Sequence, residues 1–156
     1  MKTEVVFSLN GEDTELNVPT HWTLLKCLRD VLGLTSAKQG CESGHCGACI
    51  VLSGDKPVNS CLVLSAELGD QEIWTLEGLR DRGAMIILQD SFIEHAAFQC
   101  GICTPGLLMT SYGLLLQNPR PTQDDVRLAL AGNLCRCTGY QRVIDAVVES
   151  GERLSG

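Results

Sequence analysis

The sequence lacks the segments that take a chain into or across a membrane. No stretch approaches the roughly 20 apolar residues of a spanning helix. The longest candidate, residues 106–116, is short and is interrupted by Thr110, Ser111 and Gly113. The N-terminal segment MKTEVVFSLNGEDTELNV has neither the apolar core nor the small-residue cleavage site of a secretory signal. We therefore expect a cytoplasmic chain without a transmembrane segment.

Basic clusters and recognisable catalytic motifs are also missing. The formal net charge is −7 and no group of Lys and Arg stands out, which argues against nucleic-acid binding, because that needs basic side chains to displace counterions. No Ser/His/Asp arrangement, carboxylate pair or phosphate-binding loop is recognisable. The sequence thus indicates a protein partner and offers no catalytic residue.

Cysteine, in contrast, is abundant: eight of the nine cysteines fall into two groups of four. The first group is Cys41, Cys46, Cys49 and Cys61, and the second is Cys100, Cys103, Cys135 and Cys137. The C-x4-C-x2-C run of the first group, followed by a later cysteine, is the plant-type [2Fe–2S] spacing. Because four thiolates hold one such cluster, the sequence predicts two clusters and an electron carrier.

Two other uses of the cysteines stay open at this point. Structural zinc also takes four cysteines in C-x2-C pairs, and this alternative is stronger for the second group than for the ferredoxin-like first group. Disulfides are disfavoured because no secretion signal is present. The ninth cysteine, Cys27, lies three residues after Leu24 and four before Val31, which indicates a packed core thiol.

The N-terminal half has the pattern of a small sheet crossed by one helix. The expected strands cover residues 5–9, 15–18, 48–52, 58–63 and 72–76. Asn10 and Gly11 suit a tight hairpin turn between the first two strands. Thr23 can cap a helix over residues 24–32 that ends at Gly33. Two strands, a helix and further strands predict a β-grasp sheet.

The C-terminal half shows only helical patterns. The expected helices cover residues 85–98, 105–117, 122–131 and 139–150. Thr122 and Asp125 have the spacing of a capping box, and Pro105 suits a first helical turn. Four short antiparallel helices predict a bundle.

The predicted fold class is therefore α+β. A β-grasp, plant-type ferredoxin-like domain over residues 1–78 is expected to precede a four-helix bundle domain over residues 83–156. The boundary falls where the segment 77–83 loses strand character. Two half-size cores would each be marginal alone, so metal ligation is expected to stabilise both.

The residues around the cysteines suit cluster binding. Gly40, Gly44 and Gly47 alternate with the first three cysteines and allow positive φ angles and a close approach of backbone N–H groups. Such hydrogen bonds help to set the reduction potential. Each pair of the second group precedes a predicted helix, whose positive N-terminus favours thiolates. The histidines show no triad spacing; His45, inside the first loop, is either a surface residue or a hydrogen-bond donor to the cluster.

The motifs GCESGHCGAC, QCGICTPG and GNLCRCTGYQ, in this order with Cys61 between the first two, resemble the small iron–sulfur subunit of the molybdenum hydroxylases, the xanthine oxidase family. The resemblance covers nearly the whole chain and implies the β-grasp domain and helix bundle described above. It also implies a large partner subunit that carries molybdopterin and, in many bacterial members, a medium subunit that carries FAD. Ile102 and His45 depart from residues frequent in relatives, but neither departure removes a ligand.

The resemblance further implies a direction of electron flow. Electrons would pass from molybdenum to the cluster on the second cysteine group, then to the cluster on the first group, and out to FAD. Gln99 and Cys137 match the positions that approach the pterin in the family. From the sequence alone, Gln99 is better explained as a polar residue at a helix end.

Two rival functions belong to other classes. A free-standing two-cluster ferredoxin-like carrier would need only one exposed cluster and a small transient interface, which leaves the helical domain unexplained. A zinc-stabilised interaction module would match the cysteine count but not the plant-type loop. The visible colour of iron–sulfur clusters distinguishes either electron carrier from the zinc module. Co-purification with a large subunit distinguishes the subunit from the free-standing carrier.

Overall fold

The computed structural model describes residues 1–156 and begins with the expected hairpin. Strand β1 (Lys2–Leu9) pairs with β2 (Glu12–Pro19) in antiparallel fashion. Asn10 and Gly11 at the turn have φ angles of 55° and 86°, the left-handed conformation that this tight turn requires. Alternate side chains of β1 are buried, so one face of the hairpin covers a core.

The helix after the hairpin is shorter and wider than expected. Helix α1 (Leu24–Lys26) continues directly as a π-helical turn, η1 (Cys27–Val31), and not as one regular α-helix. The Thr23 hydroxyl accepts the predicted capping bond from the Lys26 N–H at 3.3 Å. Leu24, Leu25, Cys27 and Leu28 are all buried in the core on the sheet. The ninth cysteine is thus the core thiol that its spacing predicted.

Three more strands complete a mixed sheet with the order β2-β1-β5-β3-β4. They are β3 (Ile50–Ser53), β4 (Lys56–Asn59) and β5 (Glu72–Trp74), with β5 parallel to β1. The strand expected over residues 58–63 was wrong beyond Asn59, because β3, its partner, begins at Ile50 and offers no pairing for later residues. The chain turns there, and this turn carries Cys61 toward the first cysteine loop.

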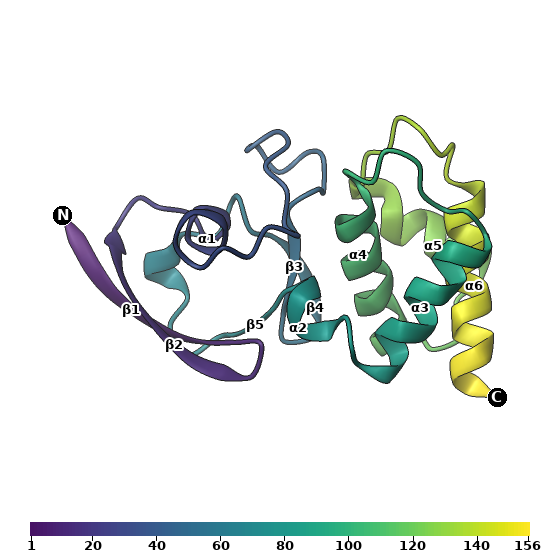
Figure 1. The fold of residues 1–156 in the computed structure, drawn as a ribbon, viewed down its shortest axis with the longest axis horizontal. Helices are drawn as coiled ribbons and strands as arrows, with labels where there is room; N and C mark the ends of the chain where they lie inside the picture. Colours follow the sequence, from purple (N-terminus) through teal and green to yellow (C-terminus); the bar gives the residue numbers. More distant parts are fainter.

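All the other elements of the chain are helices or 3-10 turns (Figure 1). They are α2 (Leu76–Leu79), α3 (Gly83–Glu94), α4 (Thr104–Gln117), α5 (Gln123–Ala129) and α6 (Gln141–Ser155), with 3-10 turns η2 (Ser65–Glu67) and η3 (Leu130–Gly132). No helix combines the length and the apolar character that crossing a membrane requires. The capping box of Thr122 and Asp125 is present as predicted.

The limits of α3 and α6 differ from the expectation. Helix α3 ends at Glu94, four residues early, because Ala96 takes a left-handed φ of 49° and the Ala97 N–H bonds back to the Phe92 oxygen. Helix α6 begins at Gln141, because Gly139 and Tyr140 both have positive φ angles. Its C-terminal end extends to Ser155, beyond the expected Ser150.

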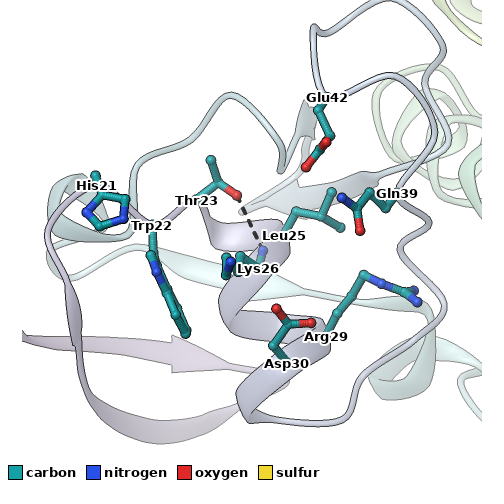
Figure 2. Close-up of a pocket in the computed structure, with 9 residues that line it drawn as sticks. All are labelled: His21, Trp22, Thr23, Leu25, Lys26, Arg29, Asp30, Gln39 and Glu42. Carbon is teal, nitrogen blue, oxygen red and sulfur yellow. Dashed lines mark hydrogen bonds between the residues drawn. The ribbon is translucent and has the colours of Figure 1, made fainter.

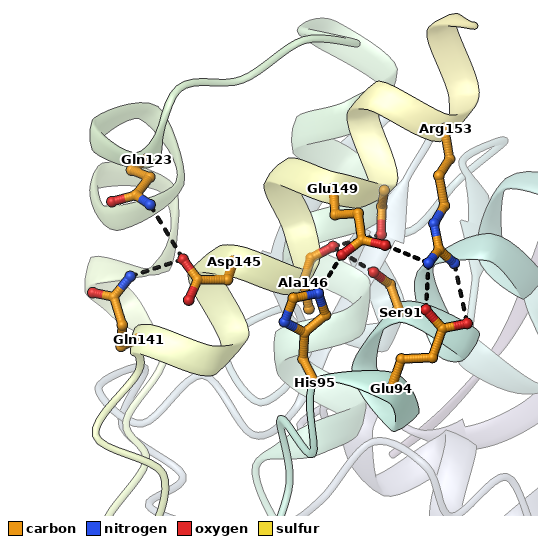
Figure 3. Close-up of polar contacts among 10 residues, drawn as sticks. Ser91, Glu94, His95, Gln123, Gln141, Asp145, Ala146, Glu149 and Arg153 are labelled. Carbon is orange, nitrogen blue, oxygen red and sulfur yellow. Dashed lines mark hydrogen bonds and ion pairs between the residues drawn. The ribbon is translucent and has the colours of Figure 1, made fainter.

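Polar contacts join the C-terminal end of α3 to α6 (Figure 3). The Ser91 hydroxyl donates to the Ala146 carbonyl at 3.0 Å. Further along, Glu149 contacts both the His95 ring and the Arg153 guanidinium, and Arg153 also pairs with Glu94 on α3. His95 and Arg153 hydrogen bond to the Glu149 carboxylate, with the His95 contact the larger cause, and lower its pKa.

The helical region packs directly against the sheet (Figure 1). Val51 and Leu52 are neighbours on β3, yet Val51 belongs to the sheet core and Leu52 to the helical core. Helix α4 lies against β3 and β4 at Gly113, where an added Cβ would sit 2.6 Å from Pro57 Cγ. The fold thus consists of a ferredoxin-like sheet region followed by a helical region. Leu52 of the sheet packs in the helical core, so the two cores meet at β3. The domain limits at residues 78 and 83 stay a prediction.

Candidate iron–sulfur sites

The first cysteine group is assembled from an irregular loop and a turn. Residues 33–49 contain no helix or strand and supply Cys41, Cys46 and Cys49, while the turn after β4 supplies Cys61. The Cys61 thiol contacts that of Cys49 and lies within electrostatic range of Cys41. The Cys46 N–H donates to Cys41 Sγ at 3.4 Å. The structure thus brings Cys61 to Cys49 and the Cys46 backbone to Cys41. That all four residues hold one cluster stays a prediction.

Backbone N–H groups surround the sulfur of Cys41. Ser43 and His45 donate to it at 3.4 Å and 3.3 Å, in addition to Cys46. The Ser43 hydroxyl, followed by these N–H groups, lowers the pKa of Cys41 to about 5. Cys41 is exposed and is a thiolate at neutral pH, the form that binds a metal. The His45 ring lies 3.0 Å from the Ser43 hydroxyl, and a role for it in tuning the cluster stays a prediction.

The glycines of the first loop act in two different ways. Gly44 and Gly47 have the predicted positive φ angles, 76° and 70°. Gly40 does not, but a Cβ there would lie 2.7 Å from Cys46 Sγ, so this position needs glycine for space. Glu42 takes a left-handed φ of 54° that the sequence did not indicate.

The other side of the first group is buried. Cys49 and Cys61 are 3% and 6% exposed, and burial, followed by the neighbouring Cys49, raises the pKa of Cys61 to about 11. The Ser60 hydroxyl donates to the Cys49 carbonyl at 2.7 Å and fixes the turn that delivers Cys61. A cluster held here would have one protected side and one side near solvent.

The second group joins two loops of the helical region. Cys100 and Cys103 lie between α3 and α4, and Cys135 and Cys137 lie between η3 and α6. The sulfurs of Cys100 and Cys137 are 3.5 Å apart, and Cys103 contacts Cys135. The predicted convergence of the two loops is therefore present.

The thiols of the second group have unequal proton affinities. Burial, followed by the contact with Cys135, raises the pKa of Cys103 to about 12, although Cys103 caps the N-terminus of α4. The expected helix-end stabilisation is thus outweighed there. Burial also opposes ionisation of Cys135, but hydrogen bonds from Thr138, one from its hydroxyl at 3.1 Å, lower the pKa of Cys135 overall. Binding a metal to Cys103 must release a proton.

The donor set suits a two-iron cluster. All nine cysteines are free thiols. A [2Fe–2S] cluster divides its four thiolates between two irons. The pairwise contacts of Cys100 with Cys137 and of Cys103 with Cys135 agree with that division.

Several residues near the second group escaped the sequence interpretation. The Tyr140 hydroxyl accepts the Cys135 N–H at 2.7 Å and donates to the Asn133 carbonyl at 2.8 Å. Asn133 itself is 2% exposed. The GNLCRCTGY segment contains all of these residues, but its spacing alone gives no sign of the contacts. Gln99 is exposed, and its Nε2 donates to the Cys137 carbonyl at 3.1 Å.

A separate hollow of about 190 Å³ borders the first cysteine loop (Figure 2). Its two basic side chains already have partners within the chain. The Lys26 ammonium lies 4.8 Å from the centre of the Trp22 ring. Arg29 Nη1 donates to the carbonyls of Thr35 and Ala37 at 3.0 Å and 2.8 Å. These contacts hold the segment that leads into the cysteine loop.

Comparison with known proteins identifies both regions. Residues 7–76 match a family described as "2Fe-2S iron-sulfur cluster binding domain", and residues 75–148 match one described as "[2Fe-2S] binding domain". The small FeS subunit of nicotinate dehydrogenase from Eubacterium barkeri is 43% identical over 97% of each chain. The small subunit of nicotine 6-hydroxylase from Paenarthrobacter nicotinovorans is 45% identical over 96% of this chain and 90% of its own. The crystal structure of quinoline 2-oxidoreductase from Pseudomonas putida 86 has a chain with a TM-score of 0.88 and 42% identity, covering 97% of each.

Proposed function

Because this chain belongs to the small iron–sulfur subunits of the molybdenum hydroxylase family, we propose that it carries electrons from a molybdopterin-bearing large subunit through two [2Fe–2S] clusters to FAD or another acceptor. It is the non-catalytic subunit of an oxidoreductase complex. The observation that carries the proposal is the approach of free thiols from separate segments, Cys61 to Cys49, Cys100 to Cys137 and Cys103 to Cys135.

We assign one cluster to each group. Cys41, Cys46, Cys49 and Cys61 would hold the first, and Cys100, Cys103, Cys135 and Cys137 the second. The clusters supply one-electron chemistry, while the chain supplies thiolates and hydrogen bonds. The N–H groups around Cys41 Sγ stabilise negative charge there, and the Thr138 hydroxyl does the same at Cys135. Such bonds are among the determinants of a reduction potential.

The exposure of the second group supports its position next to the large subunit. Cys100 and Cys137 are exposed, and apolar side chains of Phe98, Ile102 and Leu134 are 42%, 59% and 60% exposed beside them. A permanent subunit interface buries such a surface, whereas a free shuttle would leave it in water. This favours a subunit over a free-standing carrier. Gln99 and Cys137 would then face the pterin, and electrons would leave through the first group.

The remaining parts of the proposal follow from the family and the thiol chemistry. The sheet region would be the β-grasp domain of residues 1–78 and the helical region the four-helix bundle of residues 83–156. An FAD-binding medium subunit would be the acceptor. A cytoplasmic location agrees with nine free thiols, since reducing compartments keep thiols free. Nicotinate, nicotine and quinoline name the relatives above, so nitrogen heteroaromatics are the first substrates to test on the complex.

Metal analysis and magnetic spectra of the purified complex test the assignment. Two [2Fe–2S] clusters predict about four irons and four acid-labile sulfides per copy of the chain. Reduction by dithionite should bleach the visible absorption and give two distinct paramagnetic signals. Stoichiometric zinc, or a single cluster, would overturn the proposal. Purification of the chain without a large subunit would favour the free-standing carrier.

A further inference from the structure

Two consecutive residues just before Cys135 bind two consecutive carbonyls of the first cysteine loop. The Leu134 N–H donates to the Cys46 carbonyl at 2.9 Å, and Asn133 Nδ2 donates to the Gly47 carbonyl at 3.2 Å. These two hydrogen bonds form a joint between the two loops. A predicted cluster ligand lies at each end of the joint: Cys46 accepts one of the bonds, and Cys135 follows Leu134 in the sequence. The joint therefore connects the two cysteine groups directly.

The Asn133–Gly47 side of the joint is closely packed and buried. Asn133 is 2% exposed and Gly47 is buried. A Cβ on Gly47 would lie 2.4 Å from the Gly132 carbonyl oxygen, and a Cβ on Gly106 of α4 would lie 2.2 Å from the Gly47 oxygen. The backbone at Gly47 is thus held between α4 and the segment that carries Asn133. In such a site the Asn133 amide and the Gly47 carbonyl must bond to each other or stay unsatisfied.

The Tyr140 side chain fixes the same segment, residues 133–135, from the other side. The Tyr140 hydroxyl bridges the Asn133 carbonyl and the Cys135 N–H, with distances of 2.8 Å and 2.7 Å. Asn133, Leu134 and Cys135 therefore have their positions set at both ends. Cys46 Sγ and Cys135 Sγ are connected by covalent bonds and by a single hydrogen bond, from the Leu134 N–H to the Cys46 carbonyl.

We propose that Asn133 is a positioning residue that holds the Leu134–Cys46 hydrogen bond closed and so fixes the electronic contact between the two cysteine groups. The inference rests on the proposed function, because it concerns the passage of one electron between the two groups, in which no bond is formed or broken. Asn133 would ligate nothing and would act only through the backbone of Leu134 and Gly47. Its removal should therefore weaken coupling between the clusters without removing either cluster.

The test compares Asn133→Ala with Ser91→Ala in the full chain within its purified complex. Ser91 is a matched control because its side chain is also fully buried and donates a single bond to a carbonyl, here that of Ala146 at 3.0 Å, away from the joint. In Asn133→Ala we expect unchanged iron and sulfide, a smaller magnetic splitting between the two dithionite-reduced clusters, and roughly tenfold faster deuterium exchange of the Leu134 amide. In Ser91→Ala the splitting and the Leu134 exchange should stay as in the wild type.

Unchanged splitting and unchanged Leu134 exchange in Asn133→Ala would overturn the inference. If that variant does not retain its clusters, Asn133→Ser, which keeps a shorter donor, should retain them with an intermediate splitting. The wild type gives an independent reading, since rapid exchange of its Leu134 amide would overturn the inference whatever the variants do. Failure of the proposed function is distinguishable, because it would show as a wild-type complex that lacks the two clusters.

Discussion

Gln99 Nε2 donates a hydrogen bond to the main-chain oxygen of Cys137 at 3.1 Å, although the two residues are 38 positions apart in the sequence. The bond ties the loop before α4 to the loop before α6, and both loops carry cysteines of the second group. The side chain is exposed, and its Oε1 accepts no hydrogen bond from the chain. Gln99 can therefore hold Cys137 in place and still offer its amide oxygen to a partner.

The first prediction concerns these two roles of Gln99. Gln99→Ala should slow the reduction of the clusters by substrate roughly tenfold, the effect of losing a contact worth about 1.4 kcal/mol. Dithionite should still reduce both clusters, because no ligand is lost. Stopped-flow absorbance of the complex measures both reactions. Gln117→Ala is the matched control, since its Nε2 contacts only the Asp55 carbonyl, at 3.5 Å, on an exposed surface.

Two results would assign Gln99 differently. Cluster reduction at the wild-type rate in Gln99→Ala would show that Gln99 is a loop-tying residue without influence on electron entry. Loss of iron from that variant, with iron retained in Gln117→Ala, would show that the bond to Cys137 is needed to assemble the second group.

The second prediction separates the ninth cysteine from the ligands. Cys27 is fully buried in the sheet core, and burial is the main cause of its raised pKa. Cys27→Ser should leave both paramagnetic signals intact while lowering the free energy of unfolding by about 1–3 kcal/mol, because a hydroxyl replaces a thiol among apolar side chains. Cys46→Ser should remove only the signal of the first group. A cluster lost in Cys27→Ser would contradict the ligand assignment.

Features encoded by neighbouring residues were predictable from the sequence. Asn10 and Gly11 specify their turn locally, and Thr122 with Asp125 specifies the start of α5. The cysteine groups were recognisable because the spacing is local in four of the six pairs of consecutive ligands. In each case the residues that cause the structure lie within a few positions of one another.

Contacts between distant segments were not predictable. The strand expected beyond Asn59 ends because β3 begins at Ile50, a limit imposed by the partner strand. The Cys103 thiol has a raised pKa because tertiary packing buries it beside Cys135, and this reverses the effect expected from its helix end. Asn133 is an ordinary polar residue in the sequence, and only the approach of Gly47, 86 positions away, gives it a partner.

The third prediction concerns pH and the segment leading into the first loop. The Glu77 carboxylate accepts hydrogen bonds from the Ser36 N–H, at 2.9 Å, and from the Ser36 hydroxyl. Burial acts to raise the pKa of Glu77, but these bonds outweigh it and the pKa is lowered. A carboxylate with a lowered folded-state pKa adds stability that is present above its unfolded value of about 4.3 and is lost as the pH falls through the folded value.

Glu77→Gln should therefore lower the free energy of unfolding at pH 7 and flatten its decline below about pH 4.3. Denaturant unfolding at a series of pH values measures the effect. Glu67→Gln is the control, because Glu67 is exposed and its side chain makes no hydrogen bond within the chain. An equally steep acid decline in Glu77→Gln and in the wild type would show that the Ser36 contact contributes nothing.

The last prediction compares two serines that are both 0% exposed inside helices. The Ser111 hydroxyl on α4 has no hydrogen-bond partner, whereas the Ser150 hydroxyl on α6 donates to the Ala146 carbonyl at 2.7 Å. Alanine improves helix propensity equally at both positions, so the difference between the two substitutions reports the hydrogen bond. Because an unsatisfied buried hydroxyl is costly, Ser111→Ala should raise the free energy of unfolding by up to about 1 kcal/mol, and Ser150→Ala should lower it by roughly 0.5–1 kcal/mol. Denaturant unfolding measures both, and equal destabilisation would show that Ser111 is hydrogen-bonded in solution, for instance to a buried water.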